Sequence, residues 1–168
     1  SYPYLFLSEE EFPRLAFHRG ARKARGRYYG PYPSAGAVRE TLQLLQKLFP
    51  VRQCEDSYFR NRSRPCLQYQ IERCSAPCVG FITPQAYAQD VGDTASFLEG
   101  KAQDVVARWV EKMEAASRRL EFEEAAQLRD QISALRAVQE KQYVSGERGD
   151  LDIVAVASEG GIACVQLF

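Results

Sequence analysis

Four of the five cysteines in this 168-residue chain lie in one short segment. They are Cys54, Cys66, Cys74 and Cys78, with the spacing C-x11-C-x7-C-x3-C. The residues around them are rich in Arg, Ser, Asn and Pro, which is a poor setting for a thiol that packs in an apolar core. A chain with 45% hydrophobic residues can bury a core of its own and does not resemble a small secreted domain held by disulfides. The segment therefore predicts a metal centre bound by these four thiols.

The spacing also bears on which metal the four cysteines bind. Structural zinc sites usually take their cysteines in closely spaced pairs, and only Cys74 and Cys78 form such a pair. Iron–sulfur clusters with four cysteine ligands tolerate more varied spacing. The neighbouring arginines do not discriminate, because four thiolates leave a net charge of about −2 around either Zn²⁺ or a 4Fe–4S core. We expect an iron–sulfur cluster of the 4Fe–4S type, with zinc as the alternative.

The net charge of zero hides an uneven distribution of charge along the chain. Residues 1–80 contain 13 Lys and Arg against 7 Asp and Glu, whereas residues 81–168 contain 9 against 15. The basic half includes a stretch without acidic residues, at 18–27, and a second group of arginines beside the cysteines. Both groups could follow a phosphate backbone, although solvated loops have the same composition. The candidate nucleic-acid contacts are Arg19, Arg22, Lys23, Arg25, Arg27, Arg60, Arg62 and Arg64.

The elements that must position the thiols begin with three short strands, predicted in the stretches YPYLFL, RLAFHR and RYYG. A helix is expected to follow, with Ser34 as its N-cap and Pro50 just beyond its end. The cysteine segment is too rich in Pro, Arg and Ser to form a long regular element. Thr83 and Pro84 then have the composition of a helix start, and Gly100 that of a helix end.

Two longer helices are predicted next, at about 101–120 and 122–142. Each carries an apolar stripe with the spacing of helices that pack as an antiparallel pair. The stripes are Val106, Trp109, Val110, Met113, Ala116 and Leu120 in the first helix, and Phe122, Ala125, Leu128, Ile132, Leu135 and Val138 in the second. The short turn between them, LEFEE, surrounds Phe122 with glutamates. From periodicity alone, Phe122 is expected to pack against its own hairpin.

The C-terminal stretch LDIVAVASEGGIACVQLF predicts a β-hairpin that turns at 159–161. Within it, Cys164 is expected to be a small apolar core residue, and Asp150 and Asp152 indicate a turn before they indicate a metal site. His18, the only histidine, is expected to be a surface or hydrogen-bonded residue. No apolar run approaches the roughly 20 residues that cross a bilayer. Strands followed by helices and further strands predict an α+β fold.

Three blocks of the sequence occur in an order that is specific to one family: GRYYGPYPSAGAVRETLQLLQKLFPVRQC, NRSRPCLQYQIERCSAPC and MEAASRRLEFEEAAQLRDQI. The chain resembles the UvrC family, the C subunits of the bacterial UvrABC excinucleases, over essentially its whole length. The resemblance implies a role in nucleotide excision repair, in which the family incises damaged DNA on both sides of a lesion. It also implies a cytoplasmic location.

The resemblance divides the chain into regions. Residues 1–50 are expected to follow a GIY-YIG nuclease domain, and residues 51–100 to form a small mixed α/β region with the metal centre. Residues 101–143 would be the antiparallel helical hairpin called UVR, and residues 150–168 the first strands of an RNase H-like domain. Because the family's two sets of catalytic residues lie outside these regions, we expect no catalytic residues here and no activity from this chain alone.

The UVR hairpin also implies a partner, since the B and C subunits of these excinucleases associate through it. The resemblance therefore reverses the expectation for Phe122, which would face the C-terminal helical hairpin of the B subunit. The expected partner-binding residues are Leu120, Phe122, Glu123, Ala126, Arg129 and Ile132. Damaged double-stranded DNA in complex with the B subunit is the second expected partner, and no membrane is expected. An alternative function is a non-nuclease adaptor in protein quality control, which would join a metal-binding module to a UVR hairpin.

Overall fold

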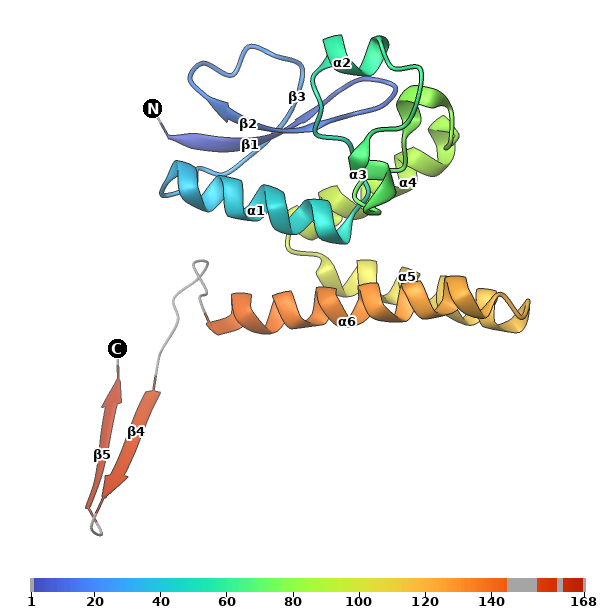
Figure 1. The fold of residues 1–168 in the computed structure, drawn as a ribbon. Coiled ribbons are helices and arrows are strands. Elements are labelled where there is room, and N and C mark those ends of the chain that lie inside the picture. Colours follow the sequence, from blue (N-terminus) through green and yellow to red (C-terminus); the bar gives the residue numbers. More distant parts are fainter. Residues whose placement is uncertain (1, 145–153, 160–161, 168) are drawn as a thin grey trace. The chain divides into compact units, whose positions relative to one another are not determined.

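The computed structural model describes residues 2–144, 154–159 and 162–167. The chain divides into two compact units, Ser1–Leu135 and Arg136–Phe168. The first unit contains a three-stranded sheet, the cysteine segment and the turn of the helical hairpin (Figure 1). Mixed strands and helices are confirmed. None of the described helices combines the length and the apolar character that crossing a bilayer requires.

The three predicted N-terminal strands form one antiparallel sheet. β1 (Pro3–Ser8) is the central strand, with β2 (Leu15–Arg19) on one side and β3 (Gly26–Tyr29) on the other. The central strand is also the most buried, and its residue Leu5 is fully enclosed. Short runs of apolar and aromatic residues were therefore sufficient to locate the three strands.

Helix α1 (Ala35–Leu48) packs along β1 and β2 (Figure 1). Ser34 is its N-cap, as predicted, and its hydroxyl accepts a hydrogen bond from the Ala37 N–H at 3.1 Å. The buried residues of the helix recur at helical spacing, and they are Val38, Leu45 and Leu48. These residues form the face of α1 that contributes to the core.

The cysteine segment contains only short helical elements, in agreement with its composition. They are α2 (Asp56–Arg60), α3 (Leu67–Gln70) and the 3-10 helix η1 (Pro77–Val79). α4 (Pro84–Leu98) follows, and the Thr83 hydroxyl caps it by accepting a hydrogen bond from the Ala86 N–H at 3.2 Å. The predicted start of this helix is therefore confirmed.

An aromatic cluster and a buried carboxylate join α4 to the helix that follows. The Phe49 ring lies 5.7 Å from that of Phe97 and 5.4 Å from that of Trp109, measured between centroids. Asp93 of α4 accepts hydrogen bonds from the Arg108 Nε at 2.9 Å and from the Trp109 indole N–H at 2.8 Å. Asp93 is buried, so these two donors compensate its charge.

The predicted pair of longer helices is α5 (Ala102–Arg118) and α6 (Phe122–Val144) (Figure 1). Most of the predicted stripe residues are buried or half-buried, but two of them are not. Leu120 is 72% exposed and Phe122 is 64% exposed. The physical reason is that α5 ends at Arg118, and Leu120, with a φ of 64°, turns away from the stripe.

In the second unit, β4 (Val154–Glu159) and β5 (Ile162–Leu167) pair antiparallel, with Glu159 opposite Ile162. The strands of the predicted β-hairpin are therefore confirmed. The predicted turn at Gly160 and Gly161, and the two acids Asp150 and Asp152, lie outside the described residues. Cys164 lies in β5, where only the backbone is described. That this hairpin opens an RNase H-like domain stays a prediction.

Candidate functional site

The four predicted ligands come together in one part of the first unit, which we call the cysteine cluster. Cys54 precedes α2, Cys66 is the residue before α3, Cys74 lies between α3 and η1, and Cys78 lies within η1. Cys54 is exposed and the other three are half-buried. The charges of the other three thiols all act on Cys74, so the four sulfurs are electrostatic neighbours.

Two thiols of the cysteine cluster, Cys74 and Cys78, resist ionisation in this arrangement. Burial, with a smaller contribution from the three neighbouring thiols, raises the pKa of Cys74 to about 11. Burial also raises the pKa of Cys78, with Cys54 and Cys66 adding to the rise and Arg62 acting against it. Cys74 is therefore a neutral thiol at pH 7, and a cation bound by it would have to displace its proton.

Within the described residues, no three His, Cys, Asp or Glu side chains are placed so that they could hold a metal ion. The sulfurs can still influence the charge of one another, because charges act over much longer distances than a metal–sulfur bond of about 2.3 Å. The donor set is the one that zinc or a four-cysteine cluster takes. The sulfurs would have to be drawn together to bind either of them.

The backbone on both sides of Cys74 adopts the left-handed conformation. Glu72 has a φ of 57° and Ala76 a φ of 53°. For residues with a side chain, this conformation costs roughly 1–2 kcal/mol each. Strain of this kind persists where the surrounding structure requires it and is concentrated at functional sites. The chain around Cys74 is thus held in a shape that local preferences oppose.

A buried arginine, Arg52, ties the start of the cysteine segment to the sheet. Its side chain is 2% exposed. The guanidinium donates hydrogen bonds to the carbonyl oxygens of Phe12 at 2.8 Å and Cys54 at 3.1 Å. It also forms ion pairs with Glu10 at 2.8 Å and Asp56 at 2.9 Å. Burial opposes its charge, but hydrogen bonds to Asp56 and Cys54 outweigh burial and raise the pKa of Arg52.

Tyr87 of α4 completes this support. Its ring is fully buried, and its hydroxyl donates to the carbonyl oxygen of Pro13 at 2.6 Å. The same hydroxyl accepts a hydrogen bond from the Arg52 backbone N–H at 3.0 Å. Burial raises the pKa of Tyr87, so the hydroxyl stays neutral and donates at any ordinary pH. Through Arg52, the start of the cysteine segment is therefore anchored to Glu10 and Phe12, about forty residues earlier in the sequence.

The second candidate site is the turn of the helical hairpin, where Leu120 and Phe122 form what we call the apolar tip. Both side chains are more than half exposed. Their neighbours Glu121, Glu123 and Glu124 are exposed acids, and Glu121 pairs with Arg119 at 2.7 Å. Phe122 is therefore not an internal staple of the hairpin. An exposed aromatic ring with a charged rim is typical of a protein-binding hot spot.

The apolar tip is carried by a Schellman turn. The Leu120 N–H donates to the Ser117 carbonyl and the Glu121 N–H to the Ala116 carbonyl, both at 3.0 Å. The left-handed position in this motif belongs to Leu120, with a φ of 64°, although glycine is usual there. Leucine costs backbone energy at this position and gains no burial within the chain. Packing within the chain therefore does not explain this leucine.

A groove of about 480 Å³ lies beside the apolar tip. Its walls are Met113, Glu114, Ser117 and Arg118 of α5, and Phe122, Ala125, Ala126 and Arg129 of α6. Three of the predicted partner-binding residues thus share one surface, and the exposed Glu123 lies next to Phe122 in the chain. Ile132 is placed differently, because it is 6% exposed and packs inside the hairpin.

The predicted nucleic-acid residues fall into two groups, of which the first lies on the connection between β2 and β3. Arg22, Lys23 and Arg25 are exposed there, and the Arg22 guanidinium lies 5.2 Å from the Tyr4 ring centroid. Arg27 differs from them, since it pairs with Glu99 at 3.4 Å. All of these side chains are exposed, but Arg27 is already paired with an acid.

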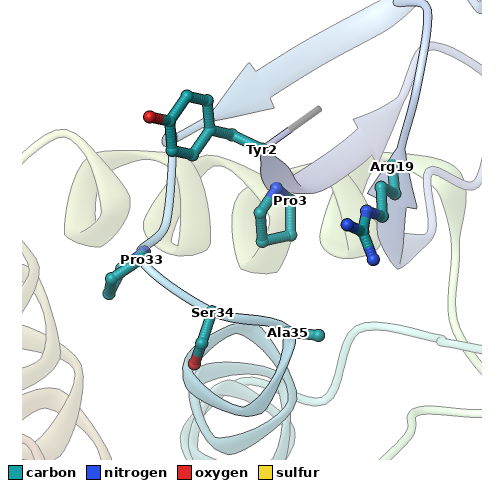
Figure 2. Close-up of a pocket in the computed structure, with 6 residues that line it drawn as sticks. All are labelled: Tyr2, Pro3, Arg19, Pro33, Ser34 and Ala35. Carbon is teal, nitrogen blue, oxygen red and sulfur yellow. The ribbon is translucent and has the colours of Figure 1, made fainter.

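The connection is fixed at both ends. Gly26 has a φ of 149°, and a side chain there would collide with the Leu7 carbonyl. At the other end, Arg19 is exposed beside the start of α1 (Figure 2). It borders a pocket of about 280 Å³ that is also lined by Tyr2, Pro3, Pro33, Ser34 and Ala35 (Figure 2). The basic connection is thus an exposed loop with a fixed entry and exit.

The second basic group, Arg60, Arg62 and Arg64, lies at the end of α2 and just after it. All three side chains are exposed. The Arg62 guanidinium lies 6.0 Å from the Tyr58 ring centroid. This group adjoins the cysteine cluster, because the Arg62 charge acts on Cys78.

His18 is hydrogen-bonded, as predicted. Its Nε2 lies 3.1 Å from the Ala21 carbonyl oxygen, and its ring centroid lies 4.9 Å from that of Tyr28. The ring also lies 6.1 Å from Phe6. These contacts account for the histidine without a catalytic or metal-binding role.

Sequence reasoning missed the residues that support the two sites. Arg52 has the appearance of any surface arginine, and its partners Glu10 and Phe12 are about forty residues away in the sequence. The sequence contained a weak indication that Asp93 is buried, since an acid within the apolar face of a helix requires a hydrogen-bond donor there. The exposed aromatics near the cysteines were not singled out either, because burial depends on neighbours that one sequence does not specify.

Two family models match the chain. The UvrC/Cho excinuclease middle domain matches residues 2–97, and the UvrB/uvrC motif, or UVR, matches residues 103–138. The first match contains the sheet and the cysteine cluster, and the second contains the apolar tip. No solved structure matches the chain. The matched segments correspond to the two candidate sites, and the adaptor alternative gains no support from them.

Curated relatives match the whole chain. UvrABC system protein C of Alkalilimnicola ehrlichii is 60% identical over 169 residues, which cover 100% of this chain. The proteins of the same name from Pseudomonas entomophila and Methylococcus capsulatus are 61% and 60% identical, over 99% of this chain. The chain spans 28% of the length of each of these relatives. Because the middle-domain model covers more than half of it, the chain belongs to the UvrC family.

Proposed function

We propose that this chain is the recruiting and linking segment of a UvrABC excinuclease C subunit, and that its hairpin binds UvrB. The observation that carries the proposal is the apolar tip. Leu120 and Phe122 are exposed on a strained turn inside the stretch that matches the UvrB/uvrC motif. Incision of damaged DNA would be an activity of the whole protein, to which this chain contributes binding.

The partner surface that fits the tip is a second hairpin of the same kind, the C-terminal hairpin of UvrB. Two such hairpins could meet with each covering the aromatic ring of the other. The groove beside Phe122 offers room for an apolar side chain, and Glu114, Arg118 and Arg129 on its walls offer charges that a partner could pair. Burying a side chain such as Phe122 is worth roughly 1.5–3 kcal/mol.

The test is the affinity of the chain for a synthetic UvrB C-terminal hairpin. Phe122→Ala should weaken binding by about one to two decades, the equivalent of the burial energy. Because Phe122 is 64% exposed, its removal should leave helicity and melting temperature unchanged. Tyr58→Ala is the matched control, since Tyr58 is 62% exposed but lies outside the motif. Normal binding by the Phe122 variant would contradict the proposal.

The second part of the proposal is that Cys54, Cys66, Cys74 and Cys78 hold a metal centre, an iron–sulfur cluster before zinc. Four cysteine sulfurs are a complete donor set for either group, and the spacing of these four favours the cluster. A cluster would supply a structural or electron-carrying centre to the segment. Glu72 and Ala76, in the left-handed conformation on either side of Cys74, turn the loops that carry the proposed ligands.

Metal content tests this part. Chain purified without oxygen should be brown, contain iron and acid-labile sulfide, and lose its visible absorption with dithionite. Stoichiometric zinc without iron would contradict the iron–sulfur cluster, but the assignment of the four cysteines as metal ligands would stand. Cys74→Ser should lose the metal, whereas Cys164→Ser, at the cysteine outside the cluster, should retain it.

The third part is contact with duplex DNA through the two basic groups. Arg22, Lys23 and Arg25 are exposed on a loop with fixed ends, and Arg60 to Arg64 are exposed beside the cysteine cluster. Each lost phosphate contact should reduce the slope of log affinity against log salt by about 0.9 for duplex DNA. Charge reversal at Arg22, Lys23 and Arg25 that changed neither affinity nor slope would show that this loop is only solvated.

A further inference from the structure

Exposed apolar side chains are concentrated around the cysteine cluster. Within the described residues, nine large hydrophobic side chains are exposed, and five of them lie between residues 58 and 81. They are Tyr58 at 62%, Leu67 at 63%, Tyr69 at 39%, Ile71 at 44% and Phe81 at 58%. Leaving this much apolar surface in water is unfavourable, and exposed apolar side chains gathered in one segment often mark a binding surface.

The aromatic members of this group are placed by the cysteine loops. Tyr69 follows Cys66 by three residues, and Phe81 follows Cys78 by three. Their rings lie 5.2 Å apart with an interplanar angle of 71°, so they join the two loops at the surface. Tyr58 lies on the exposed side of α2, with the Arg62 guanidinium over its ring. Each of the three rings therefore keeps a free part toward solvent.

The charge of the same stretch is strongly positive. Residues 57–81 contain four arginines, at 60, 62, 64 and 73, against one acid, Glu72. Arg60, Arg62 and Arg64 are exposed. Charge complementarity therefore favours a polyanion as the binding partner. It disfavours a protein surface with few acids and an uncharged apolar ligand. We call Tyr58, Tyr69, Phe81 and these three arginines the aromatic–arginine surface.

Duplex DNA and single-stranded DNA differ in whether their bases can stack on an aromatic side chain of a protein. Paired bases in a duplex are stacked on one another, so their faces are not accessible to a protein ring. Unpaired bases expose their faces, and aromatic rings with arginines between them bind such strands by stacking and by phosphate contacts. An arginine over a tyrosine ring, as with Arg62 and Tyr58, adds a flat cation to the same surface.

We propose that the aromatic–arginine surface binds single-stranded DNA, with bases stacked on Tyr58, Tyr69 and Phe81 and phosphates on Arg60, Arg62 and Arg64. The inference rests on the DNA contact of the proposed function and specifies it. The arginines of this surface would contact the phosphates of duplex and of single strands alike, as the proposed function has it, whereas its rings would select a strand whose bases have been separated. It gives the segment a preference for opened DNA.

The test compares two probes by fluorescence anisotropy, a labelled oligothymidylate of about 15 nucleotides and a duplex of the same length. Phe81→Ala and Tyr69→Ala should each weaken oligothymidylate binding by about five- to a hundredfold and leave duplex binding unchanged. Phe81→Trp should keep single-strand binding, because it keeps a flat ring. Phe122→Ala, which removes an equally exposed ring at the apolar tip, is the matched control and should bind both probes normally.

Each other outcome has a separate meaning. Phe81→Leu keeps apolar bulk without a flat ring, so wild-type binding by this variant would overturn stacking and indicate a protein partner instead. Replacing Arg60, Arg62 and Arg64 by Gln should weaken both probes and reduce the single-strand salt slope by about 0.7 per contact. If the Gln variant weakens both probes and the Ala variants change neither, the DNA contact stands and the stacking proposal fails. If the Gln variant also changes neither, this surface does not contact DNA.

Discussion

The cysteine segment and the helical hairpin obtain their shapes in different ways. The hairpin consists of two long helices whose own apolar stripes supply its buried residues, such as Ala116 and Leu135. The cysteine segment has only short elements, and side chains from outside it, Arg52 and Tyr87, hold it in place. The comparison teaches that local periodicity builds the first region, whereas long-range polar contacts build the second.

The two regions nevertheless share one property. Three non-glycine residues have positive φ in the part of the chain that the structure describes, and all three lie at a candidate site. Glu72 and Ala76 flank Cys74, and Leu120 carries the apolar tip. Backbone strain at both sites is the expected result when the position of a side chain matters more than local stability.

The largest effect should come from the hairpin core. Leu135 is fully buried, so Leu135→Ala should destabilise the chain by about 2–5 kcal/mol through lost burial and a cavity. Urea unfolding followed by circular dichroism at 222 nm, the usual helix signal, measures this loss. Ser133→Ala, on the exposed side of the same helix, should change stability by less than about 0.5 kcal/mol. If the two variants lost the same free energy of unfolding, the buried apolar stripe would not be what stabilises the hairpin.

The comparison predicts a similar loss when a single polar residue is removed from the other region. Arg52→Met keeps the length of the side chain but leaves two carboxylates and two carbonyls without their donor. We expect a loss of roughly 2–4 kcal/mol, because Glu10 and Asp56 keep partial access to water. Arg60→Met, at an exposed arginine, is the control for the same urea experiment. Wild-type stability of Arg52→Met would show that the segment holds its own shape.

A smaller effect is expected in α4, the helix between the two regions. Burial raises the pKa of Asp90 to about 6, with Lys112 acting against the rise and Asp93 adding to it. The folded chain therefore binds this proton more tightly than the unfolded chain, whose pKa is the ordinary 3.8. The contribution of Asp90 to the free energy of unfolding is therefore complete below pH 3.8, and it is lost as the pH rises through about 6.

Asp90→Asn should remove this pH dependence and stabilise the chain at pH 7 by about 1–3 kcal/mol. Melting temperatures at pH 5 and pH 8, on either side of the pKa of about 6, measure the difference. Asp130→Asn replaces an exposed acid of α6 and serves as the control. If wild type and Asp90→Asn depend on pH in the same way, Asp90 does not carry the effect.

The smallest effect concerns the strained turn. Leu120→Gly should relieve a left-handed backbone that costs a leucine roughly 1–2 kcal/mol, less the entropy that glycine adds to the unfolded chain. The expected net gain is about 0.5–1 kcal/mol in the free energy of unfolding. Leu120→Ala keeps a side chain at this φ and should show no gain. A destabilised Gly variant would mean that the leucine packs within the chain after all.

Sequence reasoning located the elements whose cause is local. Ser34 and Thr83 were identified as caps because their hydroxyls act on an N–H three residues away. The four cysteines were singled out because thiols in a polar setting need a purpose other than packing. Leu120 was assigned to an apolar stripe because periodicity does not reveal that α5 ends two residues earlier.

The remaining features depend on residues that are distant in the sequence. The role of Arg52 is set by Phe12 and Glu10, and no local pattern connects them. The ring contact between Tyr69 and Phe81 follows from how two loops fold against each other. Single-sequence reasoning therefore found what each candidate site contains, but not what supports it.

The hydrogen bonds of Asp93 have a mechanical consequence. They fasten α5 to α4 at Arg108 and Trp109, and α5 continues beyond Trp109 for about 14 Å to Arg118, at 1.5 Å per residue. Over that length α5 is one half of the hairpin, with Ala116 buried, and acts as a rigid spacer. A force that a partner applied at the apolar tip would therefore reach α4 through Asp93 and the Trp109 ring. The length of α5 thus sets how far the apolar tip lies from α4, and the Asp93 hydrogen bonds together with the Phe49–Trp109 ring contact fix the direction in which the hairpin extends.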